Sequence, residues 1–267
     1  MKVTIVISYY KALDNLVIIL NALNSQSDKN FEVIVSEDDF NEKTIQFIKE
    51  TAPTLEFKIH HIYQKEDLGF RKNIMLNRAI LTCTTDYMVF IDGDCIPHRH
   101  FVKEYRKNLA KAYFLIGRAV MLDKKMSESL RKEKSIHKLN LISILLSNSK
   151  HKKCTIYSPY FQLSIKTRGL VGRNWGIYKQ HLIDINGFDN DYIFAGVGED
   201  VDIEWRLLAT GIKPKSVKNK AIVYHLYHNK VYSELNVAKN YELLYNKQQI
   251  NNIKCINGLE QLLPTKN

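Results

Sequence analysis

The chain has 267 residues, of which 45% are hydrophobic and 25% are charged, and its formal net charge is +11. This length suits one large α/β domain or two small ones, and the composition is that of a globular protein with a hydrophobic core. No apolar run reaches the ~20 residues of a membrane-spanning helix, and the N-terminus does not read as a cleaved secretion signal, so we expect a cytoplasmic protein.

The four cysteines are far apart in the sequence, at Cys83, Cys95, Cys154 and Cys255. This spacing argues against a disulfide framework or a zinc site and favours scattered, reduced thiols.

Strand-like and helix-like patterns alternate through the first ninety residues. Runs rich in β-branched and other apolar residues predict strands at 3–8, 31–36, 57–63 and 87–92, of which the first and the last are expected to be buried. Helical spacing of apolar residues predicts helices at 14–25, near 42–50 and at 70–81, with Pro53 ending the second helix. Four alternations of this kind predict an α/β fold with a mostly parallel, doubly wound sheet.

Acidic residues follow three of these strands. They are Glu37, Asp38 and Asp39 after the second strand, Asp67 after the third, and Asp92 and Asp94 after the fourth. The carboxyl ends of parallel strands lie at one edge of the sheet, where such folds bind ligands. Carboxylates gathered there repel one another unless a cation lies among them, so we expect a divalent metal.

The motif Asp92-Gly93-Asp94 is weak evidence by itself, because the sequence also contains the pairs Asp189/Asp191 and Asp200/Asp202. Its place at the end of a buried strand favours a functional role over a turn with solvated aspartates. Mn²⁺ and Mg²⁺ accept carboxylate oxygens while keeping coordination sites open for phosphate oxygens.

Beyond residue 110 the alternation becomes irregular, and no linker or repeat marks a domain boundary. Glu199 and Asp200 precede an amphipathic helical pattern, so they either cap that helix or supply a general base. His225 and His228 follow a strand-like run and could complete a metal site begun at Asp94. Trp175 is either a core residue or an apolar platform for a ligand.

More than half of the excess positive charge lies between Lys124 and Lys153, where nine Lys and Arg residues face only Glu128 and Glu133. The apolar run 139–146 lies inside this segment. It is either a buried helix with a solvated basic face or a peripheral contact with an anionic membrane. We do not expect nucleic-acid binding, because the predicted cleft edge is acidic.

Several motifs, in order along the chain, resemble family 2 inverting glycosyltransferases of the GT-A fold, and in particular bacterial capsule and surface-polysaccharide enzymes of the chondroitin-polymerase type with a galactosyltransferase-like C-terminal half. These motifs are VTIVISYY, EVIVSEDDF, QKEDLGFRKNIMLNRAI, YMVFIDGDCIPH, NWGIYKQHLIDINGFDNDY, GEDVDIEWRL and VYHLYH. The resemblance implies one catalytic domain at 1–230, with a nucleotide-binding half at 1–97 and an acceptor half at 98–230. Residues 231–267 would form a helical extension.

The resemblance also implies site residues by position. The donor, a UDP-sugar, would be held by Tyr9, Asp38, Asp67, Arg71 and Asp92, while Asn174 and Trp175 would contact donor or acceptor sugar. Mn²⁺ or Mg²⁺ would be bound by Asp94 and His225, with His228 as the alternative ligand. Asp200 would be the catalytic base, Glu199 would bind the acceptor, and Gly196 and Gly198 would leave room for a sugar.

The implied activity is inverting transfer of a hexose or N-acetylhexosamine to a glycan or lipid-linked glycan acceptor in surface-polysaccharide synthesis. The segment 124–153 could hold the enzyme at the inner face of the cytoplasmic membrane. The alternatives are a metal-independent carboxylate glycosidase, a nucleotidyltransferase, for which the first strand lacks a glycine-rich loop, and a catalytically silent glycan- or membrane-binding module. The sequence leaves the oligomeric state open.

Overall fold

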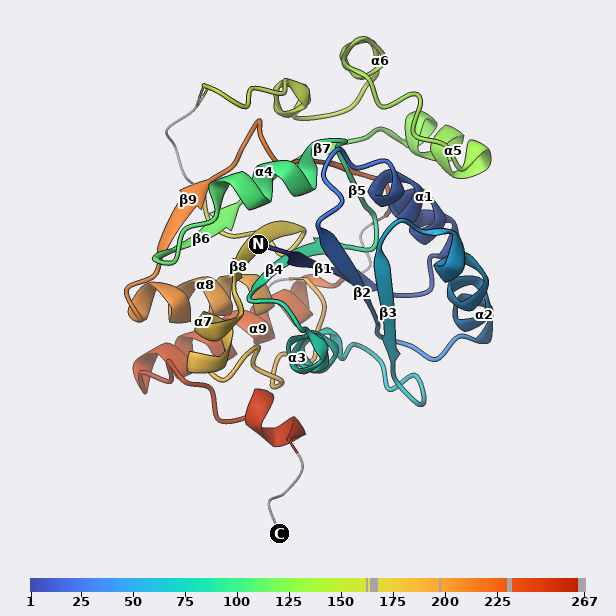
Figure 1. Cartoon of the computed structure of the whole chain (residues 1–267). Coiled ribbons are helices and arrows are strands. Elements are labelled where there is room, and N and C mark those ends of the chain that lie inside the picture. Colours follow the sequence, from blue (N-terminus) through green and yellow to red (C-terminus); the bar gives the residue numbers. More distant parts are fainter. Residues whose placement is uncertain (162, 164–167, 197, 230–231, 264–267) are drawn as a thin grey trace.

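A seven-stranded sheet runs through the middle of the protein, with strand order β3-β2-β1-β4-β8-β6-β9 (Figure 1). The computed structural model describes residues 1–161, 163, 168–196, 198–229 and 232–263. The parallel strands of the N-terminal half are β1 (Val3–Tyr9), β2 (Phe31–Glu37), β3 (Lys58–Tyr63) and β4 (Tyr87–Asp92). The others are β8 (Asn174–Tyr178), antiparallel to β4 and to β6 (Tyr113–Ile116), and β9 (Lys213–Ser216), parallel to β6.

The predicted alternation of the first ninety residues is confirmed, with α1 (Leu13–Asn24), α2 (Glu42–Thr51) and α3 (Lys72–Thr82) between the strands. Residues 52–54, including Pro53, continue α2 as a 3-10 turn (η1, Ala52–Thr54). The third helix begins two residues later than expected. The backbone N–H of Arg71 donates to the Asp38 carboxylate at 2.8 Å, and this contact holds residue 71 just outside the helix.

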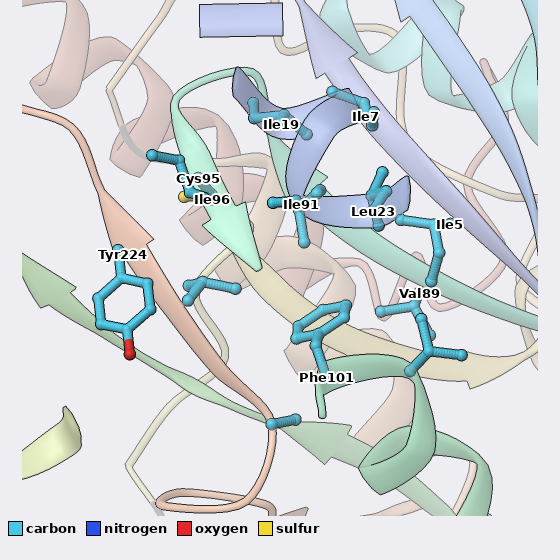
Figure 2. Close-up of a cluster of buried hydrophobic side chains, with 14 of the residues drawn as sticks. Ile5, Ile7, Ile19, Leu23, Val89, Ile91, Cys95, Ile96, Phe101 and Tyr224 are labelled. Carbon is cyan, nitrogen blue, oxygen red and sulfur yellow. The ribbon is translucent and has the colours of Figure 1, made fainter. Parts of the chain in front are cut away.

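Two hydrophobic clusters cover the two faces of the large sheet, because successive side chains of a strand point to opposite faces. Ile5 and Ile7 of β1 pack in one cluster with α1 and with α4 (Phe101–Asn108), whereas Val6 packs in the other with α3 and α8 (Glu199–Ala209). Figure 2 shows the first cluster, in which α1, β1, β4 and β5 meet. The four cysteines are free, which agrees with the scattered thiols expected from the sequence, and all four are buried.

A second, three-stranded sheet has the order β5-β10-β7. It consists of β5 (Cys95–Pro97), β7 (Arg118–Met121) and β10 (Ile222–His225). β4 and β5 are joined by the turn at Gly93, whose N–H donates to the Ser8 carbonyl at 2.6 Å. A Cβ at residue 93 would lie 2.8 Å from that carbonyl oxygen, so this close approach requires glycine. The turn sets the directions of the aspartates on either side of it.

The basic segment folds as α5 (Lys124–Glu133), α6 (Leu141–Leu146) and a 3-10 turn, η2 (Lys152–Thr155), outside the sheets. Burial of the apolar run 139–146 as a helix is wrong as a prediction: within α6 only Ile144 is fully buried, while Leu141, Ile142, Leu145 and Leu146 are exposed. No helix in the described part of the chain is long and apolar enough to cross a membrane.

The C-terminal part forms α7 (Lys179–Asp184), α8, then α9 (Glu234–Gln249) and a last 3-10 turn, η3 (Leu259–Leu262). The helix expected from about residue 232 is confirmed, while the expected boundary at 230 and 231 falls outside the described residues. The Lys247 ammonium of α9 pairs with Asp189 and with Asp191, the latter at 2.6 Å, and Leu259 is part of the core beneath α3. The extension therefore packs against the rest of the fold.

Replacing Lys247 with alanine should lower the free energy of unfolding by about 3 kcal/mol, because it leaves the buried Asp189 carboxylate without its cation. Urea denaturation measures this loss. Lys254→Ala is the matched control, since Lys254 and its partner Glu260 are more than half exposed and such a pair contributes at most about 1 kcal/mol. Equal losses in the two variants would contradict the role given to Lys247.

Candidate active site

Carboxylates from both halves of the chain meet at the carboxyl edge of the large sheet. Asp38 follows β2, Asp92 ends β4, and Asp94 follows the Gly93 turn. Glu199 and Asp200 come from the first turn of α8, far along the sequence. A small cavity borders the second group, and its lining residues are Ser8, Lys72, Leu76, Phe90, Gly172, Trp175, Phe188, Glu199 and Asp200.

Asp94 lies beside two histidines. Its Oδ2 is 3.3 Å from Nε2 of His225 and 3.1 Å from Nε2 of His228, and the two rings are 5.2 Å apart. The pairing of β10 with β5 places His225 opposite Cys95, next to Asp94. The following loop is held by the Leu226 N–H, which donates to the Asp94 carbonyl at 2.8 Å. The sequence left open which histidine belongs with Asp94, and the structure brings both to it.

This group of side chains fits a divalent cation. One carboxylate oxygen and two imidazole nitrogens are a donor set that Mn²⁺ accepts, and the buried Cys95 thiol lies beside Asp94 and His225. Burial lowers the pKa of His225, which favours the neutral, ligating form of that ring. The hydrogen bond with Asp94 raises the pKa of His228 to about 9. Without a cation, His228 therefore carries the charge that balances Asp94.

Lys72 joins the two halves of the site, a role that the sequence analysis missed. Its ammonium lies 2.9 Å from Asp92 and 3.0 Å from Glu199, and its side chain is only 18% exposed. The residue begins α3, directly after the Arg71 backbone that Asp38 binds. A lysine at the start of a helix, near a strand-end aspartate, is the only sequence signal for this contact.

The two acids of α8 have different environments. Burial opposes ionisation of Glu199, but the Lys72 ammonium outweighs it and keeps the Glu199 pKa below its usual value. Burial, together with the neighbouring Glu199 charge, raises the pKa of Asp200 to about 6. The Asp200 carboxylate accepts hydrogen bonds from two backbone N–H groups, of Val201 at 2.9 Å and of Gly172 at 3.4 Å. Asp200 is therefore the acid of this pair that can take up a proton near neutral pH.

Asp38 is buried beside the start of α3. It accepts hydrogen bonds from the Gln64 amide at 2.6 Å and from the Arg71 N–H at 2.8 Å, and burial raises its pKa to about 6. The Arg71 guanidinium donates to the Phe70 carbonyl at 2.9 Å. Asp67 lies nearer the surface, where Lys11 pairs with it at 2.5 Å.

Tyr9, which was expected to contact the nucleotide, is buried. It is 2% exposed, and its hydroxyl is 3.2 Å from that of Thr44 on α2. Tyr10, the next residue, is about half exposed and donates a hydrogen bond to Asp67 at 3.1 Å. The resemblance assigned Tyr9 to the nucleotide, but in the structure Tyr9 packs in the hydrophobic core and Tyr10 is the exposed tyrosine, because successive strand residues point to opposite faces.

Asn174 and Trp175 are core residues in this structure. The Asn174 amide accepts from the Tyr105 hydroxyl at 2.7 Å and donates to the carbonyls of Arg118 and Ala221, so its polar atoms are all paired within the protein. Trp175 stacks on Phe90 with ring centroids 4.6 Å apart. The indole of Trp175 borders the cavity but packs in the core, which was one of the two interpretations of this residue. The side chain of Asn174 has no free polar atom for the predicted contact with a sugar.

The space expected beside Gly196 and Gly198 is filled by the protein. A Cβ at Gly198 would lie 2.5 Å from the Tyr192 ring, and one at Gly196 would lie 3.0 Å from Val237. Gly198 has φ +143°, a backbone conformation that favours glycine. These glycines therefore shape the turn into α8, where a side chain at either position would meet Tyr192 or Val237.

The other two D-x-D pairs have structural partners. Lys247 binds both Asp189 and Asp191, and Arg206 binds the buried Asp202 with one of its guanidinium nitrogens at 2.6 Å. Asp189, Asp191 and Asp202 are thus paired with cationic side chains, whereas Asp200 accepts backbone hydrogen bonds and Asp94 faces two histidines.

Comparison with protein families gave two overlapping matches. Residues 4–167 match the sequence profile described as glycosyl transferase family 2, and residues 151–229 match the one described as N-terminal domain of galactosyltransferase. None of the curated proteins compared with the chain matches it in sequence.

Solved structures with a similar fold include TarS of S. aureus (TM-score 0.61, 15% identity), a mannosyltransferase, PcManGT, of Pyrobaculum calidifontis in complex with GDP-Man and Mn²⁺ (0.63, 15%), and GalNAc-T7 with UDP, GalNAc and Mn²⁺ (0.62, 12%). They cover 92%, 97% and 92% of this chain. The chain in turn spans 39%, 68% and 47% of theirs. At these identities the likeness concerns the fold, and it agrees with the GT-A fold expected from the sequence.

Asp200→Asn should stabilise the protein at pH 8 by about 3 kcal/mol, because it removes a carboxylate whose pKa rises from its usual value to about 6 on folding. A raised pKa adds stability at low pH, and this contribution is lost as the pH rises through about 6. The advantage of the variant should therefore shrink to about half at pH 5. Urea denaturation at both pH values, with the surface variant Asp184→Asn as control, measures this difference. A gain that does not depend on pH would contradict the assignment.

Proposed function

Because this chain belongs to glycosyl transferase family 2, we propose that it transfers a hexose or N-acetylhexosamine from a UDP-sugar to a glycan or lipid-linked glycan, with inversion at the anomeric carbon. The observation that carries the proposal is the arrangement of charged side chains at one edge of the sheet. Asp94 lies beside two histidines, Lys72 joins Asp92 to Glu199, and Asp200 follows Glu199. Assembly of a surface polysaccharide in the cytoplasm is the setting that the motif pattern favours.

Asp200 is the proposed general base. Its carboxylate borders the cavity, and two backbone N–H groups hold it in place. It would take the proton of an acceptor hydroxyl as that oxygen attacks the anomeric carbon from the face opposite the departing UDP. Single displacement of this kind converts an α-linked donor into a β-linked product. A base with a pKa of about 6 is largely ionised at neutral pH and still accepts a proton.

Glu199 is the proposed acceptor-binding residue. Lys72 keeps it ionised, so it would accept a hydrogen bond from a second hydroxyl of the acceptor while Asp200 takes the reacting proton. Lys72 would also hold Asp92 in position, and through these two contacts it fixes the distance between the donor half and the acceptor half. A residue of this kind positions others, and neither of its contacts is to the reacting atoms.

The donor would lie along the ends of β1, β2 and β4. Asp38 and Arg71 border the place expected for the uracil of the donor, and Asp67 with Tyr10 lies at the outer edge of that place. Asp94, His225 and His228 would hold Mn²⁺ or Mg²⁺. When bound, this ion neutralises the charge that develops on the leaving diphosphate. In support, solved structures of similar fold carry UDP-GlcNAc in TarS, UDP with Mn²⁺ in GalNAc-T7, and GDP-Man with Mn²⁺ in PcManGT.

UDP should bind to the wild type only when Mn²⁺ is present, and Asp94→Ala should abolish this binding because the main oxygen ligand is lost. Calorimetric titration of UDP with Mn²⁺, and then with a chelator, tests this. Asp14→Ala, which removes a mostly exposed carboxylate, is the control and should bind as the wild type does. Absence of UDP binding to the folded wild type would contradict the donor, and the same titration with GDP would show whether another base is used.

Asp200→Asn should bind UDP as the wild type does and release UDP from UDP-sugars about 10²–10⁴ times more slowly, because it cannot accept the proton. A panel of UDP-hexoses and UDP-N-acetylhexosamines, assayed with glycan acceptors, measures this loss. Glu204→Gln, on the same helix one turn further along, is the control. Undiminished turnover in Asp200→Asn would end the base assignment, and donor binding without turnover in the wild type would favour a silent binding module.

A further inference from the structure

The segment from α5 to residue 161 carries an apolar surface that the rest of the fold leaves uncovered. Leu141, Ile142, Leu145 and Leu146 of α6 are all exposed, with Ile142 at 71% and Leu146 at 83%. Tyr160 and Phe161 are exposed as well. In Figure 1 this part of the chain runs along the upper margin of the molecule, outside both sheets. We call the four exposed side chains of α6 the apolar surface.

The apolar surface is held in place from below. Ile144 is the one fully buried residue of α6 and packs in the first hydrophobic cluster. The Asp123 carboxylate accepts hydrogen bonds from the N–H groups of Met126 and Asn148, both at 2.8 Å, and so joins the start of α5 to the end of α6. The Lys152 ammonium donates to the Leu145 carbonyl at 3.0 Å. These contacts fix α6 with its leucines directed outward.

The charge around α6 is mainly positive, although Lys138 pairs with Glu133 at the end of α5. From Lys134 to Ile183 the sequence contains seven lysines, two arginines and no aspartate or glutamate. Lys138, Lys150 and Lys153 of this stretch are exposed on either side of α6. Apolar side chains flanked by cations match the boundary of an anionic bilayer, where the chains enter the acyl region and the cations meet the headgroups.

A second exposed apolar region, on and after α9, differs from α6 in the charge around it. On and after α9, Leu235, Ile250 and Ile256 are exposed to a similar degree. Residues 232–263, however, contain three lysines and three glutamates, so this region has no excess charge. A second copy of the chain is also a poor match for α6, because a symmetric contact would bring the two basic segments together.

We propose that the apolar surface docks on a lipid bilayer that contains anionic headgroups. The occupant follows from the combination of outward apolar side chains on α6 with a mainly basic flank, and it does not depend on the proposed transferase activity.

Sedimentation of the full chain with vesicles tests the proposal. With phosphatidylcholine vesicles containing one quarter phosphatidylglycerol, we expect the protein to pellet, and with pure phosphatidylcholine we expect binding at least about tenfold weaker. The double variant Ile142→Ser, Leu146→Ser should bind the anionic vesicles at least about tenfold more weakly than the wild type. Both side chains are exposed, so an unchanged thermal unfolding midpoint should confirm that the variant is folded.

The matched control is Ile250→Ser, Ile256→Ser, which removes two side chains that are 70% and 74% exposed, from the region without excess charge. It should pellet as the wild type does. Three results would overturn the proposal: no pelleting on anionic vesicles, equal pelleting of the Ile142→Ser, Leu146→Ser variant, or a lipid-free dimer in sedimentation velocity that this variant dissociates. The last result would assign the surface to a second copy.

Discussion

Repulsion among carboxylates at one edge of the sheet is the constraint on which the arrangement of this site depends. Asp38, Asp92, Asp94, Glu199 and Asp200 all lie there, although the chain as a whole is basic. Like charges held this close must be paired, neutralised by protons or bridged by cations. An ammonium lies between Asp92 and Glu199, and imidazoles lie beside Asp94. Burial raises the pKa of Asp38, and burial together with the Glu199 charge raises the pKa of Asp200.

This division gives neighbouring residues different chemistry. Glu199 and Asp200 are adjacent on one helix, yet only Glu199 contacts the Lys72 ammonium. The cation that stabilises one carboxylate leaves the other as the stronger base of the pair. Burial of Asp200 beside the negative charge of Glu199 lowers the stability of the fold at neutral pH. Reactive groups commonly reduce the stability of the protein that holds them.

Much of the fold could be predicted from the sequence, because buried parallel strands are continuous apolar runs and helices between them show their own spacing. The meeting of Asp94 with histidines could be suspected for the same reason, since both follow strands. The depth of Tyr9, the internal hydrogen bonds of Asn174 and the filling of the space at Gly198 depend on contacts between distant segments. Lys72 was missed because its partners, Asp92 and Glu199, are 20 and 127 residues away in the sequence. The outward leucines of α6 were ambiguous, since an apolar run does not say what covers it.

The ion pairs of Lys247 with Asp189 and Asp191 connect α9 to the loop that precedes α8. The galactosyltransferase-like match ends at residue 229, so Lys247 and Asn240 lie beyond the shared part of the chain. Both hold the loop that leads into α8, Lys247 through Asp189 and Asn240 through the Phe194 carbonyl. A lineage that alters its C-terminal helix would therefore shift the approach to Glu199 and Asp200 while leaving Asp94 and its histidines unchanged.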